Sequence, residues 1–317
     1  MSSKLNILVT GGAGFLGSYL CQKLLDQRNN NIICIDNFYS SDKDNIIPLM
    51  KNKNFTFIEQ DVCNFKADFS IDQIYNLACP ASPIHYQYDP VKTVQTNVIG
   101  CLNMLELAKK NNAKIFQAST SEIYGDPKIT PQSENYWGNV NPIGIRSCYD
   151  EGKRCAETLF FDYHRQYDIN IKVCRIFNTY GPRMHQNDGR VISNFIIQAL
   201  KNEPITIYGQ GLQTRSFCYV EDLIIGIIDF MNTENSITGP INLGSDDEIS
   251  IKDLAIKIIQ LTNSKSKLQF LDPVSDDPTQ RKPNLTLAKK IINWSFDVNL
   301  DNGINATIDF FKQKLNC

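Results

Sequence analysis

The chain has 317 residues, of which 42% are hydrophobic and 21% are charged. Folded domains usually hold about 100 to 200 residues, so this length favours about two domains with a substantial core and excludes a disordered or fibrous chain. The 32 basic and 34 acidic side chains give a formal net charge of −2. This balance lacks the electrostatic footprint of a protein that binds nucleic acid or an anionic membrane, so we expect neither partner.

Short β-branched runs alternate with amphipathic patterns in the first half of the chain. Strands buried on both faces that alternate with helices are typical of an α/β fold with a doubly wound parallel sheet. We predict strands at residues 6–10, 31–36, 55–59, 73–78, 114–119 and 172–176, and helices at residues 15–25, 91–110 and 149–167.

A glycine-rich segment, residues 11–17, follows the first predicted strand and opens a helix. Glycine lets the backbone approach a pyrophosphate at the helix N-terminus, which predicts a dinucleotide site. Asp36 ends the second predicted strand, where its carboxylate can accept hydrogen bonds from both ribose hydroxyls and would repel a 2′-phosphate, so NAD is favoured over NADP. A turn that only packs the helix on the strand is the alternative. The predicted cofactor-binding residues are Gly11, Gly14, Phe15, Leu16, Gly17, Asp36, Asn37, Asp61, Val62, Leu77, Ala78, Tyr149 and Lys153.

After about Phe177 the alternation breaks into loops that contain Gly and Pro, followed by a predicted helix at residues 251–262. We therefore expect a Rossmann-type domain over residues 1–177, to which the chain returns around residues 217–243. Residues 178–317 are expected to form mainly a smaller, C-terminal domain that binds the substrate.

Tyr149 and Lys153 stand four residues apart, so a helix places the phenol and the ammonium on one face. The run at residues 119–122, Ser-Thr-Ser-Glu, sits at the carboxyl end of a predicted strand, where doubly wound sheets bind their ligands. A catalytic phenolate requires the pKa of the tyrosine to fall from about 10 to near neutrality, which Lys153 and a positive nicotinamide ring could bring about. A turn that satisfies backbone groups is the alternative reading of residues 119–121.

With these motifs the sequence resembles the extended short-chain dehydrogenase/reductases that act on nucleotide sugars, over nearly the whole chain. The segments at residues 76–86, 134–142, 146–154 and 175–183 resemble the UDP-glucuronate decarboxylases in particular. The resemblance implies NAD as cofactor, UDP-glucuronate as substrate and UDP-xylose as product. It also implies a homodimer joined through the helices at residues 91–110 and 149–167.

The triplet Thr120-Ser121-Glu122 distinguishes the decarboxylases from related nucleotide-sugar enzymes. The 4,6-dehydratases carry an Asp-Glu pair where this chain has Ser121 and Glu122, and the Asp protonates the departing 6-hydroxyl. The 4-epimerases usually have a small residue at the position of Glu122. Another nucleotide-sugar dehydratase or epimerase, or a non-catalytic NAD-sensing binder, remains the alternative function.

The resemblance also implies roles for individual residues. Tyr149 would take the proton of the sugar 4-hydroxyl while Thr120 hydrogen-bonds the same oxygen, and the hydrogen on C4 would pass to NAD. The resulting β-keto acid would lose carbon dioxide, be protonated at C5 and be reduced again at C4. Ser121 and Glu122 are assigned to ring distortion or C5 protonation, and Arg215 to the substrate carboxylate, the diphosphate or both. The residues expected to hold UDP are Asn178, Arg190, Val191, Tyr208 and Arg281, with Tyr208 near the base and Arg281 near the diphosphate.

The remaining signals concern the compartment, metals and one departure from the family pattern. Ten cysteines without a C-x-x-C pair, several in apolar runs, indicate free thiols in a reducing compartment, and a chain that starts almost at the glycine loop indicates a cytoplasmic protein. The three histidines are far apart in sequence, so we predict no metal site.

Asp42 stands where the decarboxylases usually have basic residues, so weaker adenosine contacts are expected there.

Overall fold

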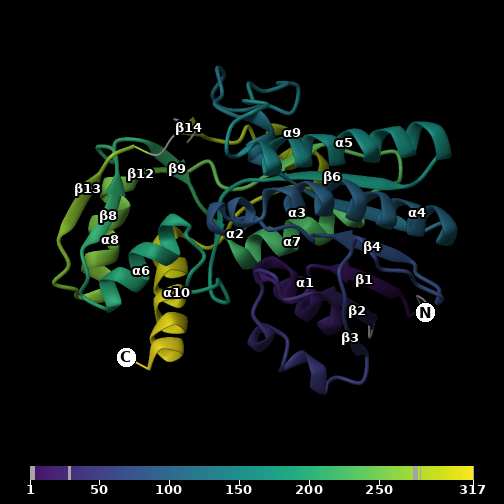
Figure 1. Ribbon diagram of the computed structural model, residues 1–317, viewed down its shortest axis with the longest axis horizontal. Coiled ribbons are helices and arrows are strands. Elements are labelled where there is room, and N and C mark those ends of the chain that lie inside the picture. Colours follow the sequence, from purple (N-terminus) through teal and green to yellow (C-terminus); the bar gives the residue numbers. More distant parts are fainter. Residues whose placement is uncertain (1–3, 28–29, 274–277, 279, 317) are drawn as a thin grey trace.

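A parallel sheet of seven strands lies at the centre of the larger part of the molecule (Figure 1). The computed structural model describes residues 4–27, 30–273, 278 and 280–316. In the described chain the strand order is β11-β6-β5-β4-β1-β2-β3, and each neighbouring pair is parallel. The predicted doubly wound α/β fold is therefore confirmed. The strands are β1 (Asn6–Thr10), β2 (Asn31–Asp36), β3 (Phe55–Glu59), β4 (Gln73–Asn76), β5 (Lys114–Thr120), β6 (Ile171–Ile176) and β11 (Ile241–Leu243).

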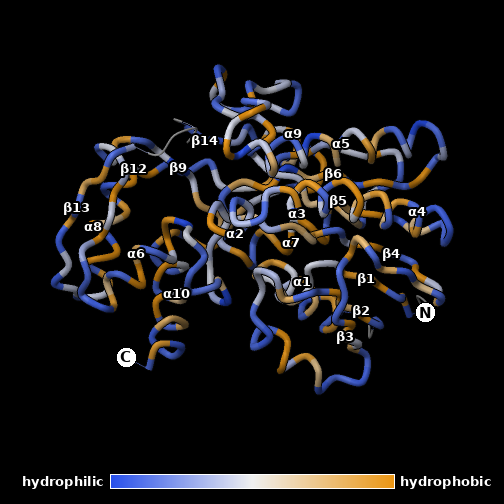
Figure 2. The backbone as a smooth tube through the Cα atoms, viewed as in Figure 1, coloured by the Kyte–Doolittle hydropathy of each residue, from blue (hydrophilic) through white to orange (hydrophobic). Residues whose placement is uncertain are grey.

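Helices cover both faces of this sheet because alternate residues of each strand are apolar on opposite sides. In β1, Ile7 and Val9 pack into one hydrophobic cluster and Leu8 into another. The first cluster includes α1 (Phe15–Asp26) and α7 (Val220–Met231), and the second includes α4 (Cys101–Asn111) and α5 (Ser147–Tyr167). Figure 2 shows these hydrophobic residues concentrated along the strands and the helices beside them.

The single helix predicted at residues 91–110 is a composite. It consists of α3 (Pro90–Gln95), a π-helical turn η3 (Thr96–Gly100) and α4. The π-turn occurs where a Cβ on Gly100 would lie only 2.6 Å from Val62 Cγ1, so the close packing of the two segments depends on this glycine. A short helix, α2 (Pro83–Tyr88), precedes α3.

The later part of the chain forms a smaller unit beside the carboxyl edge of the sheet (Figure 1). Strand β9 pairs with β12 and β14, and Arg215 stands opposite Arg281 in that register. Strand β8 pairs with β13, and α10 contacts both α6 and α8. The elements of the smaller unit are α6 (Val191–Leu200), β8 (Ile205–Tyr208), β9 (Thr214–Ser216), β12 (Glu248–Ser250), α8 (Ile251–Thr262), β13 (Leu268–Leu271), β14 (Gln280–Arg281) and α10 (Leu300–Leu315). The paired strands β7 (Thr179–Tyr180) and β10 (Cys218–Tyr219) contact α7, and α9 (Thr286–Ile292) packs against α7 and β11 of the larger part.

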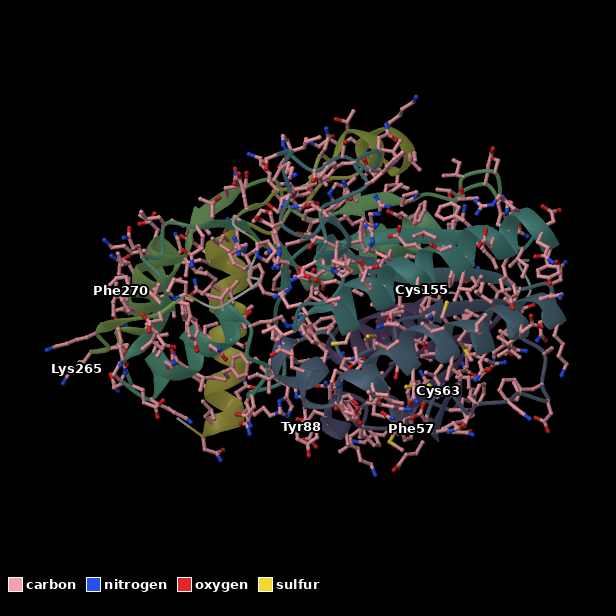
Figure 3. All side chains as sticks on the ribbon, turned by 45° about the horizontal axis from the view of Figure 1, so that its top comes forward. Phe57, Cys63, Tyr88, Cys155, Lys265 and Phe270 are labelled. Carbon is pink, nitrogen blue, oxygen red and sulfur yellow. The ribbon has the colours of Figure 1, made fainter. Side chains whose placement is uncertain are left out.

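The surface carries scattered aromatic and thiol groups rather than a membrane-spanning element. Figure 3 shows Tyr88 and Phe270 at the periphery, and both side chains are exposed. Cys63 and Cys155, also labelled there, are two of nine free cysteines in the described part of the chain. None of the helices formed by the described residues has both the length and the apolar character that crossing a bilayer requires.

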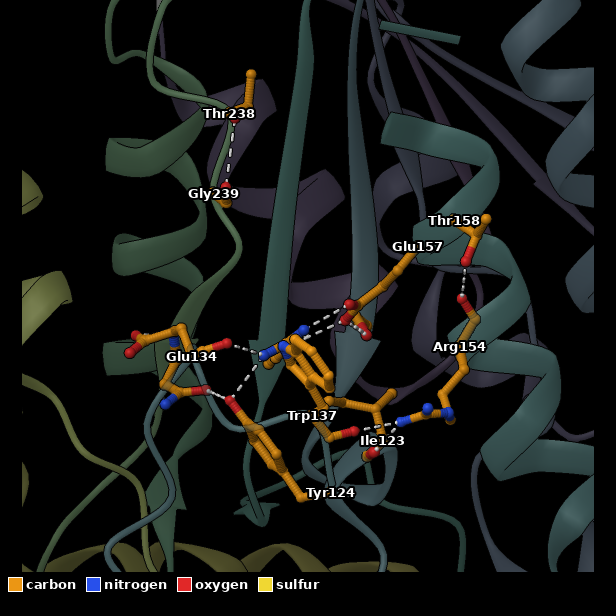
Figure 4. A network of polar contacts seen from close by, with 12 residues as sticks. Ile123, Tyr124, Glu134, Trp137, Arg154, Glu157, Thr158, Thr238 and Gly239 are labelled. Atoms are coloured by element: carbon orange, nitrogen blue, oxygen red, sulfur yellow. Dashed lines mark hydrogen bonds and ion pairs between the residues drawn. The ribbon is translucent and has the colours of Figure 1, made fainter. Parts of the chain in front are cut away.

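A buried ion pair joins α5 to the ends of β5 and β6 (Figure 4). Arg175 donates from Nε and Nη2 to the two oxygens of Glu157, at 3.0 and 2.8 Å, and Ser119 Oγ donates to Glu157 Oε1 at 2.5 Å. Arg175 Nη1 also donates to the Tyr124 hydroxyl, which in turn donates to Asn242 Oδ1 of β11 at 2.8 Å. These contacts fix α5 against the carboxyl end of the sheet.

Replacing Glu157 by Gln should destabilise the protein by about 3 to 5 kcal/mol, because it leaves the Arg175 charge buried without its counter-ion. Urea unfolding followed by circular dichroism measures this change. Asp162→Asn is the matched control, since its ion pair with Arg165 is exposed and should contribute less than about 1 kcal/mol. Equal losses in the two variants would contradict the structural role given to the buried pair.

Candidate functional site

One cavity of about 590 Å³ collects the predicted site residues. It lies where the carboxyl ends of β1, β2, β4, β5 and β6 face the smaller unit, the position at which open α/β sheets bind their ligands. Its lining includes Gly11, Gly14, Phe15, Leu16, Gly17, Asp36, Asn37, Asp61, Val62, Leu77, Ala78, Thr120, Ser121, Glu122, Tyr149, Lys153, Asn178, Arg190, Val191, Tyr208, Arg215 and Arg281. The sequence therefore identified residues that the fold does bring together, although their individual roles stay predictions.

The glycine loop forms one wall because its backbone packs closer than a side chain would allow. Gly11 has a φ of +67°, and a Cβ there would lie 3.0 Å from the backbone of Ala78. A Cβ on Gly17 would lie 2.1 Å from the carbonyl oxygen of Gly11. Gly14, which has no side chain, is the N-cap of α1, so the first turn of that helix borders an open wall of the cavity.

Asp36 holds the same wall from the end of β2. Its Oδ2 accepts from the backbone N–H of Ala13 at 3.0 Å. Its Oδ1 accepts from the N–H of Phe38 at 2.9 Å and from the Ser41 hydroxyl at 2.7 Å. These bonds orient the carboxylate and occupy three of its roughly four lone-pair positions, so Oδ2 can still accept from a ligand.

Two lysines that the sequence analysis did not single out neutralise acids at this end of the cavity. Lys92 Nζ lies 2.5 Å from Asp61 Oδ2, and this hydrogen bond lowers the pKa of Asp61 although burial opposes the change. Lys314 of α10 bonds Asp42 and lowers its pKa against the same opposing effect of burial. The acid that departs from the family pattern is thus an anchor for the C-terminal helix.

Tyr149 and Lys153 lie one turn apart on α5, as predicted. The Tyr149 ring is 6% exposed and stacks on Tyr86 at a centroid distance of 5.1 Å. Lys153 Nζ donates to the carbonyl oxygen of Ala118 at 2.9 Å and lies 5.7 Å from the centroid of the Tyr149 ring. Burial raises the pKa of Tyr149 well above its usual value. A hydrogen bond with Thr120 acts in the opposite direction and lowers this pKa. The expected fall of this pKa toward neutrality depended on Lys153 together with a positive nicotinamide ring, and it stays a prediction.

Glu122 lies between two arginines at the other side of Thr120. Thr120 Oγ1 accepts from the Glu122 N–H at 3.2 Å and caps the short 3₁₀ helix η4 (Ser121–Tyr124). Glu122 Oε2 accepts from Arg146 Nη2 and, at 2.6 Å, from Arg281 Nη2. From the sequence we expected Arg281 near a diphosphate and assigned no role to Arg146, although Arg146 stands in the same motif as Tyr149.

The remaining predicted contacts lie on the side of the smaller unit. Arg215 is buried on β9, and its guanidinium donates to the carbonyl oxygens of Thr214 at 2.9 Å and Pro278 at 2.6 Å. Arg190 makes a paired contact with Asp188 at 2.5 and 3.0 Å. Asn178 Nδ2 is buried with no hydrogen-bond partner among the described residues. A ligand that offers an acceptor would satisfy that donor.

Together, the doubly wound sheet, the glycine loop and the Thr120, Tyr149 and Lys153 cluster define an extended short-chain dehydrogenase/reductase. The family model described as GDP-mannose 4,6 dehydratase matches residues 8–307. UDP-glucuronic acid decarboxylase 5 of Arabidopsis thaliana is 51% identical over 313 residues, which cover 99% of this chain and 91% of that protein. UDP-glucuronic acid decarboxylase 1 of Xenopus tropicalis is 50% identical over 98% of this chain and 72% of that protein. The chain belongs to the UDP-glucuronic acid decarboxylase family.

Solved structures of nucleotide-sugar enzymes have the same fold. UDP-glucuronic acid 4-epimerase of Bacillus cereus, solved with UDP-glucuronic acid and NAD, is 32% identical with a TM-score of 0.89 over 98% of this chain and 100% of that chain. dTDP-glucose 4,6-dehydratase of Bacillus anthracis, solved with NAD, is 25% identical with a TM-score of 0.85 over 98% of each chain. Both similarities extend across the sheet and the smaller unit.

Gly17→Ala should destabilise the folded protein by at least about 1 to 3 kcal/mol, because the new methyl group would overlap the backbone of Gly11. Urea unfolding measures the loss. Gly14→Ala is the control, since the nearest atom to its Cβ lies 3.1 Å away and its φ of −70° suits any residue. A smaller loss for Gly17→Ala than for Gly14→Ala would refute the close packing of the loop.

Proposed function

We propose that this protein is an NAD-dependent decarboxylase that converts UDP-glucuronate to UDP-xylose and carbon dioxide. The observation that carries the proposal is the cluster around Thr120, where Tyr149 stands on one side and Glu122, between two arginines, stands on the other. A β-keto acid route needs a base at the 4-hydroxyl and cationic groups near a carboxylate. Identities of about 50% to named decarboxylases across nearly the whole chain support the assignment.

The cavity wall around the glycine loop suits a dinucleotide. A Cβ on Gly11 or Gly17 would meet backbone atoms, so these glycines let the loop fold tightly, while Gly14 at the N-cap of α1 carries no side chain that would keep a pyrophosphate from the helix N-terminus. Asp36 is oriented toward the cavity rim, where it can accept from ribose hydroxyls. Bound there, NAD supplies the hydride acceptor for C4 and a positive charge near Tyr149. We assign the cofactor mainly to residues 1–177 and 217–243, and the nucleotide sugar mainly to residues 178–317.

The residues of the chain divide the acid and base work. Tyr149 accepts the proton of the sugar 4-hydroxyl, and Thr120 hydrogen-bonds the same oxygen. Both then stabilise the C4 oxygen as electrons move onto it from the breaking C5–C6 bond. Lys153, held by the carbonyl of Ala118, contributes positive charge and orientation beside the tyrosine. Ser121 and Glu122 hold the ring and serve C5 protonation.

Arginines suit the anionic groups of the substrate. Arg215 and Arg281 stand opposite each other on β9 and β14, so both can reach a carboxylate or a diphosphate from one wall. Asn178 offers its unpaired amide to the substrate, and we assign Tyr208, which is half exposed in the cavity lining, to the uracil.

A second candidate is 4-epimerisation of UDP-glucuronate, because the Bacillus cereus 4-epimerase solved with UDP-glucuronic acid is 32% identical to this chain. Glu122 disfavours it, since epimerisation requires only that the keto sugar turns over before the hydride returns. A 4,6-dehydratase is disfavoured because Ser121 replaces the acid that protonates the leaving hydroxyl.

The test is to mix the protein with NAD⁺ and UDP-glucuronate and identify the products by mass spectrometry and trapped carbon dioxide. We expect UDP-xylose and carbon dioxide in equal amounts. Tyr149→Phe should lower turnover by at least about 100-fold while NAD binding stays nearly unchanged, because the substitution removes only the proton acceptor.

Tyr163→Phe on the same helix is the control, since its hydroxyl bonds Glu106 at an exposed position and lies outside the cavity lining. Formation of UDP-galacturonate without release of carbon dioxide would show that the protein is an epimerase and not a decarboxylase. Full activity of the Tyr149→Phe variant would show that Tyr149 is not the base.

We also propose that the protein is a cytoplasmic homodimer joined through α3, α4 and α5. The nine cysteines in the part of the chain that the structure describes are free thiols, which supports a reducing compartment. Val91 and Val94 of α3 and Ile99 of η3 expose 67%, 40% and 43% of their surface, so this face offers apolar area that a second copy can bury.

The doubly substituted variant Val91→Glu and Val94→Glu should reduce the mass in solution to that of one chain, because two charges would have to be buried in the interface. Light scattering after size-exclusion chromatography measures the mass. Ile256→Glu, at an exposed position on α8, should leave it unchanged. A monomer before substitution, or a dimer after it, would contradict the proposed interface.

A further inference from the structure

A second carboxyl group, that of Asp150, lies behind Glu122. Asp150 is 6% exposed and is absent from the lining of the cavity that contains Glu122 and Arg146. Arg146 Nη2 donates to Glu122 Oε2, and Arg146 Nε lies 3.8 Å from Asp150 Oδ2. One guanidinium therefore links two carboxyl groups. Asp150 Oδ1 is buried and has no hydrogen-bond partner among the described residues.

The charges that face Asp150 come from several elements. Burial raises the pKa of Asp150 to about 7, and Glu122 of η4 adds to the rise. Arg146, the N-cap residue of α5, and Arg281 of β14 oppose it. Asp150 thus changes its protonation near neutral pH, whereas an ordinary aspartate is ionised there. The other titratable groups in its field are Glu151, Cys148 and Tyr149 on its own helix and Tyr86 of α2, whose hydroxyl is also buried without a partner among the described residues.

The proposed reaction needs a proton that Tyr149 cannot provide. When the C5–C6 bond breaks, carbon dioxide leaves and the electron pair stays on C5, delocalised onto the C4 oxygen. The proton that Tyr149 took from the 4-hydroxyl returns to that oxygen when the hydride returns to C4. C5 therefore requires one further proton, and the balance is UDP-glucuronate plus H⁺ giving UDP-xylose plus carbon dioxide.

We propose that Glu122 and Asp150 act as a carboxyl pair that takes up one proton when UDP-glucuronate binds and delivers it to C5 after carbon dioxide has left. This inference rests on the decarboxylase function proposed above. Glu122, in the cavity lining, hands over the proton. Asp150 touches no ligand and is a positioning residue, whose charge acts on Glu122 and on the Arg146 that both carboxyl groups face, and so sets how readily the pair holds its proton.

Substrate charge provides the reason for proton uptake. Arg146 and Arg281 both line the cavity, so an incoming carboxylate competes with Glu122 for their guanidinium groups. As positive charge shifts to the substrate, two buried carboxylates lose part of their neutralisation. One of them then binds a proton, because adjacent like charges in a dry site disfavour double ionisation. UDP-xylose has no carboxylate and should not cause this shift.

Proton uptake is measured by calorimetric titration of the NAD-loaded Tyr149→Phe protein, which binds without turnover, in buffers that differ in ionisation enthalpy. At pH 8 we expect about one proton taken up per UDP-glucuronate and close to none per UDP-xylose. Adding Asp150→Asn should abolish the uptake. Glu151→Gln is the matched control, since it also replaces an acid by its amide at the neighbouring position. The Glu151 side chain is 42% exposed, so this change should leave the proton uptake unchanged.

Turnover gives a second readout in the protein that keeps Tyr149. The ratio kcat/KM should fall as pH rises through about 7, because the free protein no longer carries the proton there, and the matching limb of kcat should lie at higher pH because the bound substrate holds the proton on the pair. Asp150→Asn should lower kcat at least about 10-fold, change KM less, and remove that limb of the pH profile. A merely structural role would change the stability and KM without removing the limb.

Equal proton uptake with and without Asp150, or with UDP-xylose as with UDP-glucuronate, would overturn the carboxyl pair. If Asp150→Asn does not fold, the proton uptake of the Tyr149→Phe protein with UDP-glucuronate can still be compared with its uptake with UDP-xylose. Equal uptake with the two ligands would reject the carboxyl pair. Failure of the unsubstituted protein to form UDP-xylose would instead reject the proposed function. Decarboxylation by a protein that takes up no proton when UDP-glucuronate binds would reject the pair alone.

Discussion

The buried ion pair of Glu157 with Arg175 determines where the reactive groups of this protein lie. Tyr149, Lys153 and Glu157 follow each other at intervals of four residues, so they form one stripe on α5. Glu157 bonds Arg175 of β6 and Ser119 of β5, which fixes the end of the stripe against the sheet. Lys153 then meets the carbonyl of Ala118, and the tyrosine comes to lie beside the end of β5.

This arrangement succeeds because almost every polar group that it buries has a partner. A buried guanidinium or carboxylate is costly in isolation, yet the Glu157 and Arg175 charges satisfy each other and the hydroxyls around them. The same principle explains the chain of contacts in the sheet centre, where Thr10 Oγ1 donates to Asn76 and Asn76 donates to Gln117, both at 2.8 Å. Rigid, satisfied groups surround the cavity and leave only a few atoms, such as Asn178 Nδ2, without a partner among the described residues.

Local sequence predicted the parts of this structure that depend on local physics. The strands at residues 6–10, 31–36 and 55–59 have the expected bounds because short apolar runs end at glycine or polar residues. The π-turn at residues 96–100 was not foreseen, since it depends on how Gly100 packs on Val62. Strand β11 was missed as a separate strand because three residues are too few to show a period.

The candidate site divides in the same way. The glycine loop and the spacing of Tyr149 and Lys153 carry signals within a single motif, so the sequence revealed them. Pairing between distant residues does not leave such a signal. Arg281 and Glu122 are 159 positions apart, and only the folded chain shows that they bond. Lys92 beside Asp61 was missed for the same reason.

The two ends of the cavity use charge differently, and this difference fits the proposed chemistry. At the dinucleotide end, Asp61 and Asp42 are neutralised by Lys92 and Lys314, so the wall there has settled ion pairs. A cofactor that is reduced and reoxidised within each turnover can stay in such a fixed setting. At the sugar end, the two arginines that hold Glu122, Arg146 and Arg281, line the cavity together with Arg215. In the proposed reaction their partners change when an acidic substrate binds and change back when its carboxylate leaves as neutral carbon dioxide, so the loss of charge would itself favour release of the product.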